Sequence, residues 1–441
     1  MMQVAQILFV LSILVVLHEF GHYITARWFK VRVEKFYLFM DPWFSLFKKK
    51  IKDTEWGIGW LPIGGYVKLS GMIDESMDTE QLKQEPQPWE FRSKPAWQRL
   101  IIMLGGIIVN ILLAWFIYTV LYITVGQKYI STEKVQENGL AFGDVGQKVG
   151  FKNGDKIIAV DGKFQNNFNR MALDILFSDE VTLEREGKTL KMQLSDEQKS
   201  EIIGKEGKNF VVFRQKEIVV DSILPNSAAA KAKLKKGDKI IAFNNKPLSF
   251  FDELGTELNL IKQDSASLTI NRNNQTLNLP ILVNKERKIG FFNAFNIDKE
   301  QYIITNKMSF LQAIPAAIKE SWYLFDSNIK SLKLIFRPKT GAYKKVSSPI
   351  GIARQLPDEW NWEFIWNFTA MLSVVLAFMN LLPIPGLDGG HALFTIGEMV
   401  TGKKMNDKTA GYVQTVGMVI LLTIMALTFG KDIYQLIVDK F

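Results

Sequence analysis

"VVLHEFGHYI" spans Val15 to Ile24 and sets two histidines and a glutamate within a run of apolar residues. The chain has 441 residues and only 3 histidines. On a helix, His18 and His22 lie one turn apart on the same face, so their imidazoles can converge on one metal ion. Glu19 can then take a proton from an attacking water. This HExxH pattern predicts a zinc site for peptide hydrolysis.

Apolar residues make up 47% of the chain and are clustered. Three uncharged windows approach or exceed the ~20 residues that a membrane helix needs: Leu100–Val125, Phe364–Leu382 and Gly411–Phe429. The run Val4–Leu17 continues through HExxH without a turn residue, which predicts a fourth span. A secretory signal peptide is the alternative, but no basic residue precedes the apolar run.

The net charge of +9 does not indicate nucleic-acid binding, because much of the excess flanks the apolar spans. Basic residues follow the first span, precede the second and lie between the third and fourth. By the positive-inside rule these three places are cytoplasmic, and both termini and the long middle segment lie on the other side. The absence of cysteine excludes disulfide and thiolate chemistry.

Ionisable groups inside a membrane are costly and usually functional. The alternative, two structural histidines with Glu19 paired to a cation, is therefore disfavoured. A catalytic zinc site needs a third protein ligand and one position for water. "NLLPIPGLDGGH" (Asn380 to His391) interrupts the third span with two prolines and three glycines, and such a break requires burial or a wet cavity.

Asp388 in this break can offer a carboxylate oxygen to the metal. It can equally cap a helix that begins near Gly389, and the local pattern leaves both readings open. If Asp388 is the third ligand, the third histidine, His391, supports the site from outside the ligand set or is structural.

The middle of the chain, Gln127 to Val283, contains an imperfect repeat. "GFKNGDKIIAVDGK" (150–163) and "KLKKGDKIIAFNNK" (233–246) share a Gly-Asp turn and an alternating strand, which predicts two related β-rich modules of about 80 residues. The second copy resembles the carboxyl half of a bacterial PDZ domain, and two unrelated small barrels are the alternative. Farther on, Ser309–Phe336 has the spacing of an amphipathic helix lying on the membrane or on the protein.

HEFGH, "NLLPIPGLDGG" and PDZ-like modules between membrane spans together resemble the site-2 protease family of intramembrane zinc metalloproteases, in its RseP-type bacterial branch. The resemblance covers essentially the whole chain. It implies that His18, His22 and Asp388 bind zinc and that Glu19 is the general base. It also implies that Asn380 holds the substrate backbone near the metal.

"LPIGGYVKLSGM" (61–72) resembles the membrane-associated β-hairpin of that branch, which implies that Gly64, Gly65, Tyr66 and Val67 contact an extended substrate. "GGIIVN" (105–110) resembles the family's stretch in the second span, with Asn110 facing the interior and expected among the substrate-binding residues. "SSPIGIARQ" (347–355) resembles the segment leading into the third span. "YLFMDP" (37–42) departs from the Gly-Phe-Gly that relatives often carry.

The implied fold is a polytopic α-helical membrane protein with four transmembrane helices, a membrane-associated β-hairpin or sheet and two extracytoplasmic β-rich PDZ-like domains. The predicted parts are 1–30 (first span with HExxH), 31–96 (membrane-associated β region and connector), 97–126 (second span), 127–205 and 206–290 (PDZ-like domains), 291–360 (amphipathic helical region), 361–390 (third span with LDG), 391–410 (cytoplasmic helix or loop) and 411–441 (fourth span).

The implied function is zinc-dependent cleavage within the transmembrane segments of single-span proteins, among them anti-sigma-factor-like proteins and signal-peptide remnants. We expect a bacterial inner-membrane protein that contacts lipid but no nucleic acid, with its active site toward the cytoplasm. One rival is a non-catalytic membrane scaffold, which leaves HExxH unexplained. Another is a soluble-type zinc peptidase on an anchor, which would need metal ligands in the middle segment, where there is no histidine.

Overall fold

The computed structural model describes residues 2–72, 85–204, 210–262, 264–283, 287–294, 299–354 and 356–438. The predicted boundary at 205/206, residues 73–84 of the predicted part 31–96 and Gln355 lie outside these residues. The chain forms two compact units. Unit 1 is Met1–Gln127, Asn306–Leu332 and Val346–Phe441, and unit 2 is Lys128–Thr305 and Lys333–Lys345.

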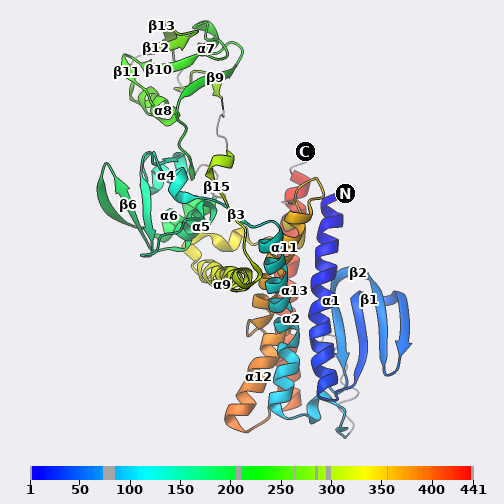
Figure 1. The fold of residues 1–441 in the computed structure, drawn as a ribbon. Coiled ribbons are helices and arrows are strands. Elements are labelled where there is room, and N and C mark those ends of the chain that lie inside the picture. The colour runs from blue at the N-terminus through cyan, green and yellow to red at the C-terminus, as the bar shows by residue number, and fades with distance from the viewer. Residues whose placement is uncertain are drawn as a thin grey trace. The chain divides into compact units, whose positions relative to one another are not determined.

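Unit 1 is built around four helices that are long and apolar enough to cross a membrane: α1 (Met2–Trp28), α2 (Ala96–Thr124), α11 (Trp362–Leu381) and α13 (Asp407–Val438). They confirm the four spans expected from the sequence. α2 packs against α1, α11 and the shorter α12 (Asp388–Thr401) (Figure 1). By contrast, only 11% of the spanning window of α13 is buried.

Glycines bring α1 and α2 into direct backbone contact. A Cβ on Gly105 would lie 2.7 Å from Thr25 Oγ1, and a Cβ on Gly21 would lie 2.8 Å from the Cα of Gly106. Small residues at such a crossing allow close helix packing in membranes. This crossing holds the HExxH turn of α1 against α2.

The chain then forms β1 (Val33–Ile51) and β2 (Thr54–Leu69), which lie beside α1 (Figure 1). Each strand bends back on itself, so Tyr37 pairs with both Tyr66 and Gly57, and Gly57 also pairs with Lys48. The two long strands thus make an antiparallel sheet of four segments rather than a simple hairpin. Among the residue pairs of the described sheet, residues 65–69 pair only with residues 33–38, so they form one edge.

Unit 1 also contains η2 (Phe91–Ser93), α10 (Pro349–Ala353) and all of α9 (Phe310–Ile335) except its last three residues. α9 is amphipathic as expected. Ala313 and Ala317 are buried in a cluster with Tyr118 and Tyr122 of α2, whereas Leu311 is 80% exposed. α9 therefore lies on the protein along one face and leaves apolar side chains uncovered on another.

Unit 2 contains two successive α/β modules, each with its own apolar core. The first comprises β4 (Leu140–Phe142), α4 (Asp144–Val149), β5 (Lys156–Val160), α5 (Phe168–Phe177), β6 (Glu180–Arg185), β7 (Lys188–Gln193), α6 (Asp196–Gly204) and β8 (Val211–Phe213). β5, β6 and β7 form one antiparallel sheet, and β4 pairs with β8.

The second module comprises β9 (Ile218–Ile223), α7 (Ala228–Lys231), β10 (Lys239–Phe243), β11 (Lys246–Pro247), α8 (Phe251–Leu260), β12 (Ser265–Arg272), β13 (Gln275–Leu282) and β14 (Phe291–Asn293). Its sheet order is β13-β12-β10-β9-β14, with β11 on β10. The connecting elements are β3 (Gln127–Ile130), paired with β15 (Ile303–Asn306), together with α3 (Thr132–Val135), η3 (Lys299–Tyr302), η4 (Pro338–Thr340) and η5 (Ala342–Lys345).

The Gly-Asp turn of each repeat is fixed by the same pair of side chains. Arg185 donates two hydrogen bonds of 2.7 Å to the fully buried Asp155, and Arg272 donates two of 2.6 Å to Asp238, which is 1% exposed. Each arginine ends the strand that pairs with the strand after the turn. Burial alone would raise the pKa of Asp238, but the bonds from Arg272 and from the Lys235 backbone N–H hold it below its ordinary value. The shared pairing supports the reading of the two segments as copies.

Candidate metal centre

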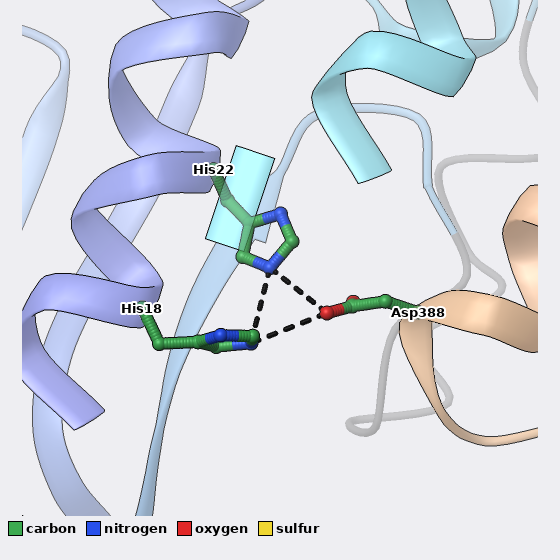
Figure 2. Close-up of side chains that lie close together, drawn as sticks. All are labelled: His18, His22 and Asp388. Atoms are coloured by element: carbon green, nitrogen blue, oxygen red, sulfur yellow. Dashed lines mark hydrogen bonds and ion pairs between the residues drawn. The ribbon is translucent and has the colours of Figure 1, made fainter. Parts of the chain in front are cut away.

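The HExxH turn presents two buried imidazoles on one face of α1 (Figure 2). His18 and His22 are 7% and 6% exposed, and their Nε2 atoms lie 3.4 Å apart. Space beneath the rings exists because α2 has a glycine there: a Cβ on Gly106 would lie 2.6 Å from both His18 Cε1 and His22 Nε2. At Gly106, α2 therefore packs directly against both imidazole rings.

Asp388 reaches the same point from α12 (Figure 2). Its Oδ2 lies 3.2 Å from Nε2 of His18 and 3.2 Å from Nε2 of His22. Leu387 occupies the N-cap position, and Asp388 is the first residue of the helix, so Asp388 is not the N-cap. A carboxylate in the first turn is favoured by the helix dipole. The structure thus directs this side chain toward the histidines.

The turn that carries Asp388 depends on close backbone contacts. A Cβ on Gly390 would lie 2.9 Å from the Cα of Pro385, and Gly386 has a φ of +100°, in the region that favours glycine. The prolines and glycines of "LPIPGLDGG" are therefore needed to start α12 immediately after α11.

The tautomer of His22 follows from its other ring nitrogen. Nδ1 lies 2.9 Å from the backbone oxygen of Ile102, which can only accept, so Nδ1 carries the hydrogen in a neutral ring. Nε2 then offers a lone pair to the space shared with Asp388 Oδ2, a buried oxygen without a hydrogen-bond partner among the described residues. Lone pairs facing one another repel unless a cation lies between them.

The spacing suits a metal ion. Tetrahedral zinc with bonds of about 2.0–2.1 Å places its ligand atoms about 3.3 Å apart, and the three observed separations are 3.2, 3.2 and 3.4 Å. A charge-assisted N–H···O bond would be shorter, about 2.7–2.9 Å. Two imidazoles and a carboxylate are also the donor set of many catalytic zinc sites. The residues present therefore fit zinc.

Glu19 lies between the histidines and the sheet edge. A Cβ on Gly65 would lie 3.6 Å from Glu19 Cγ, and the Val67 backbone N–H lies near the Glu19 carboxylate. The structure thus brings Glu19 together with Gly65 and Val67. Gly64, with a φ of +69°, immediately precedes this edge segment. Tyr66 donates a 2.9 Å hydrogen bond to Asp41 of the "YLFMDP" stretch.

Two asparagines contact opposite nitrogens of His18. Asn380 Nδ2 lies 3.1 Å from Nε2, on the side of Asp388, and Asn110 Nδ2 lies 3.1 Å from Nδ1, on the far side. His391 points elsewhere, because its Nε2 lies 2.9 Å from Gln414 Nε2 of α13. All sequence-predicted site residues thus lie at the centre or at the adjoining sheet edge, and their roles stay predictions.

Sequence reasoning missed Gly106 and the Ile102 carbonyl as parts of this centre. The adjacent glycines of "GGIIVN" were a usable signal, since a Gly-Gly pair in an apolar span indicates close helix packing. The carbonyl oxygen gave no signal, because any residue at position 102 carries one.

The chain belongs to peptidase family M50, whose model matches residues 6–424. The chain is therefore a membrane zinc metalloprotease. It is 28% identical over 468 residues to the regulator of sigma-E protease RseP of Escherichia coli, covering 98% of each chain. It is 29% identical over 450 residues to a putative zinc metalloprotease of Xylella fastidiosa, covering 96% of each. A putative zinc metalloprotease of Clostridium acetobutylicum is 27% identical over 430 residues, covering 96% of this chain and 94% of that one.

Proposed function

We propose that this metalloprotease cleaves peptide bonds within the membrane-spanning segments of single-span proteins. The observation that carries the proposal is the position of the centre: two histidines belong to a helix that can cross the membrane, and Asp388 follows another such helix after six intervening residues, 382–387. A substrate bond must therefore come to the centre at the level of the spans.

In this proposal His18, His22 and Asp388 hold the zinc ion, which when bound supplies Lewis acidity for activating water and polarising a peptide carbonyl. Glu19 takes the proton from the attacking water and returns it to the leaving amine. Asn380, whose amide lies beside His18 Nε2, donates a hydrogen bond to the substrate backbone.

The substrate binds as an added strand along Gly64, Gly65, Tyr66 and Val67. Support comes from the edge position of residues 65–69 and from the contact of this edge with Glu19. A hydrogen-bonded helix does not offer its carbonyls to such an edge, so the substrate segment must unwind locally.

The sheet itself is proposed to enter the membrane. Trp43 and Phe44 at one of its turns are 91% and 56% exposed and stack on Trp60. Lys48, Lys49 and Lys50 lie farther along the same segment. This arrangement fits a segment whose aromatic turn lies in the membrane and whose lysines lie at the membrane–water interface.

The apolar helices and the bacterial relatives support an inner-membrane location. The basic residues beside the spans favour an active site toward the cytoplasm. Unit 2 then lies outside the cytoplasm, with its modules acting as PDZ-like domains that exclude substrates still carrying bulky outer domains. The name of the Escherichia coli relative, a regulator of sigma-E protease, is consistent with anti-sigma-factor-like substrates. Signal-peptide remnants are the second proposed class, and the predicted part boundaries belong to the same proposal.

The test is cleavage of a single-span model substrate by the purified chain in lipid, with zinc content measured alongside. We expect about one zinc per chain, a cut within the span, and loss of the cut in Glu19→Gln with zinc retained. Cleavage that survives Glu19→Gln would refute the role of Glu19, and cleavage only outside the span would refute the proposed site of action. Removing residues 127–283 should admit substrates with bulky outer domains, and unchanged selectivity would contradict the size filter.

A further inference from the structure

Asn110 is the buried polar side chain of α2 at the metal centre. It is 0% exposed and lies one helical turn beyond Gly106, on the face that meets the HExxH turn. Its backbone oxygen accepts a 2.7 Å hydrogen bond from Ser373 of α11. Its position is therefore fixed by two neighbouring helices, and its amide lies 3.1 Å from His18 Nδ1.

The two ring nitrogens of His18 face different surroundings. Nε2 lies 3.2 Å from Asp388 Oδ2 and 3.4 Å from His22 Nε2, so it is the nitrogen that would face a metal. A metal at Nε2 uses its lone pair and leaves the hydrogen on Nδ1. That hydrogen needs an acceptor, and the side chain within reach is Asn110.

The amide of Asn110 has a suitable oxygen. As placed, Nδ2 faces the ring, and Oδ1 is buried without a hydrogen-bond partner among the described residues. The oxygen and nitrogen of an amide are nearly the same in shape, so a half-turn of the amide exchanges them with little steric change. After that exchange, Oδ1 accepts from Nδ1–H of His18.

His22 provides the precedent within the same centre, because its Nδ1 already meets an acceptor on α2, the carbonyl of Ile102. Positions 102 and 110 are about two helical turns apart on one helix. Thus α2 offers an acceptor to each imidazole, from the main chain for His22 and from a side chain for His18. Of the two, only the second can be removed by substitution.

We propose that Asn110 is a positioning residue that fixes the tautomer and ring orientation of His18 through its amide oxygen, rather than a residue that binds substrate. The inference rests on the proposed ligand set. Partners of this kind typically change metal affinity 10- to 100-fold when they are removed.

The experiment measures zinc affinity of the purified full-length chain by competition with a chromophoric chelator, and the visible spectrum of the Co²⁺ form. Asn110→Leu keeps the approximate volume and removes the acceptor, and we expect zinc to bind about 10- to 100-fold more weakly, with an altered Co²⁺ spectrum. Asn110→Asp keeps an acceptor in either orientation and should stay within about threefold of wild type. Thr369→Val is the matched control, since Thr369 is buried in α11 and its hydroxyl donates to the Ile365 carbonyl of the same helix.

Unchanged zinc affinity in Asn110→Leu, with a raised KM, would overturn the proposal in favour of substrate binding. Equal losses in Asn110→Leu and Asn110→Asp would overturn it in favour of the amide nitrogen, because aspartate keeps the shape and the oxygen but lacks the N–H donors. If Asn110→Leu does not fold, Asn110→Ala carries the same expectation. A wild-type chain without zinc would refute the ligand set itself, which separates that failure from failure of this inference.

Discussion

Replacing Gly106 by alanine tests whether the packing of α2 against the two imidazole rings determines the positions of the metal-ligand atoms. A Cβ at this position would lie 2.6 Å from His18 Cε1 and from His22 Nε2, whereas ordinary contact begins at 3.4 Å. The rings would have to retreat by up to about 0.8 Å, well beyond the ~0.2 Å tolerance of metal–ligand distances. Withdrawal of α2 would instead break the close backbone packing at Gly21 and Gly105.

The magnitude follows from the cost of overpacking, about 1–3 kcal/mol. If the rings move to relieve the overlap, this energy appears as a loss of zinc affinity of roughly 5- to 150-fold, since 1.4 kcal/mol corresponds to a factor of ten. Cleavage at limiting zinc should fall in parallel, while the helical content of the chain stays the same.

The assay is zinc competition with a chelator, followed by cleavage at fixed free zinc. Gly397→Ala is the matched control, because Gly397 is also helical and a Cβ there meets nothing within 4 Å. Wild-type zinc affinity in Gly106→Ala would refute the reasoning, since it would mean that the rings or helices adjust without disturbing the ligand atoms.

Three further predictions concern the modules and the sheet. Asp238→Asn should destabilise the second module by about 3 kcal/mol, as expected for breaking a buried ion pair. The control Asp221→Asn, in an exposed pair with Lys236, should change the stability little. Hydrogen exchange of β10 amides in the full chain measures both effects, and equal effects would contradict the assignment of Asp238 to a stabilising buried pair. Because the pKa of Asp238 is lower in the folded chain, this stabilisation is present above the ordinary value of 3.8 and is lost as pH falls below it, so acid should reduce β10 protection in wild type more than in Asp238→Asn. Brominated lipids should quench the fluorescence of Trp43 in a variant whose other tryptophans are replaced, and no quenching would place that turn outside the bilayer.

The sequence was most informative where chemistry is local. Spans follow from uncharged runs, and HExxH from the one-turn spacing of His18 and His22. Asp388 was harder, because a metal ligand and a helix cap give the same local pattern. The structure places Leu387 at the N-cap and so removes the cap reading, while the role of Asp388 as a ligand stays a prediction. The double pairing of Tyr37 in the sheet depends on how β1 bends, which strand propensity does not reveal.

Contacts between distant segments were inaccessible for a related reason. Gly106 matters only because two imidazoles from another helix lie on it, and the sequence of an apolar span does not reveal which side chains of other helices pack against it. Asn110 was recognised as an interior residue, but its neighbour, His18 Nδ1, emerges only when α1 and α2 are packed.

The buried Asp–Arg pair of the two modules also gives a search criterion. Arg185 follows its aspartate by 30 residues and Arg272 by 34, and the sequences around the two arginines, "TLEREGK" and "TINRNNQ", share little. A Gly-Asp turn with an arginine about thirty residues downstream, at the end of the neighbouring strand, therefore marks equivalent positions where overall identity is too low to align. The sequences of divergent copies of this module can therefore be aligned on the positions of that single ion pair.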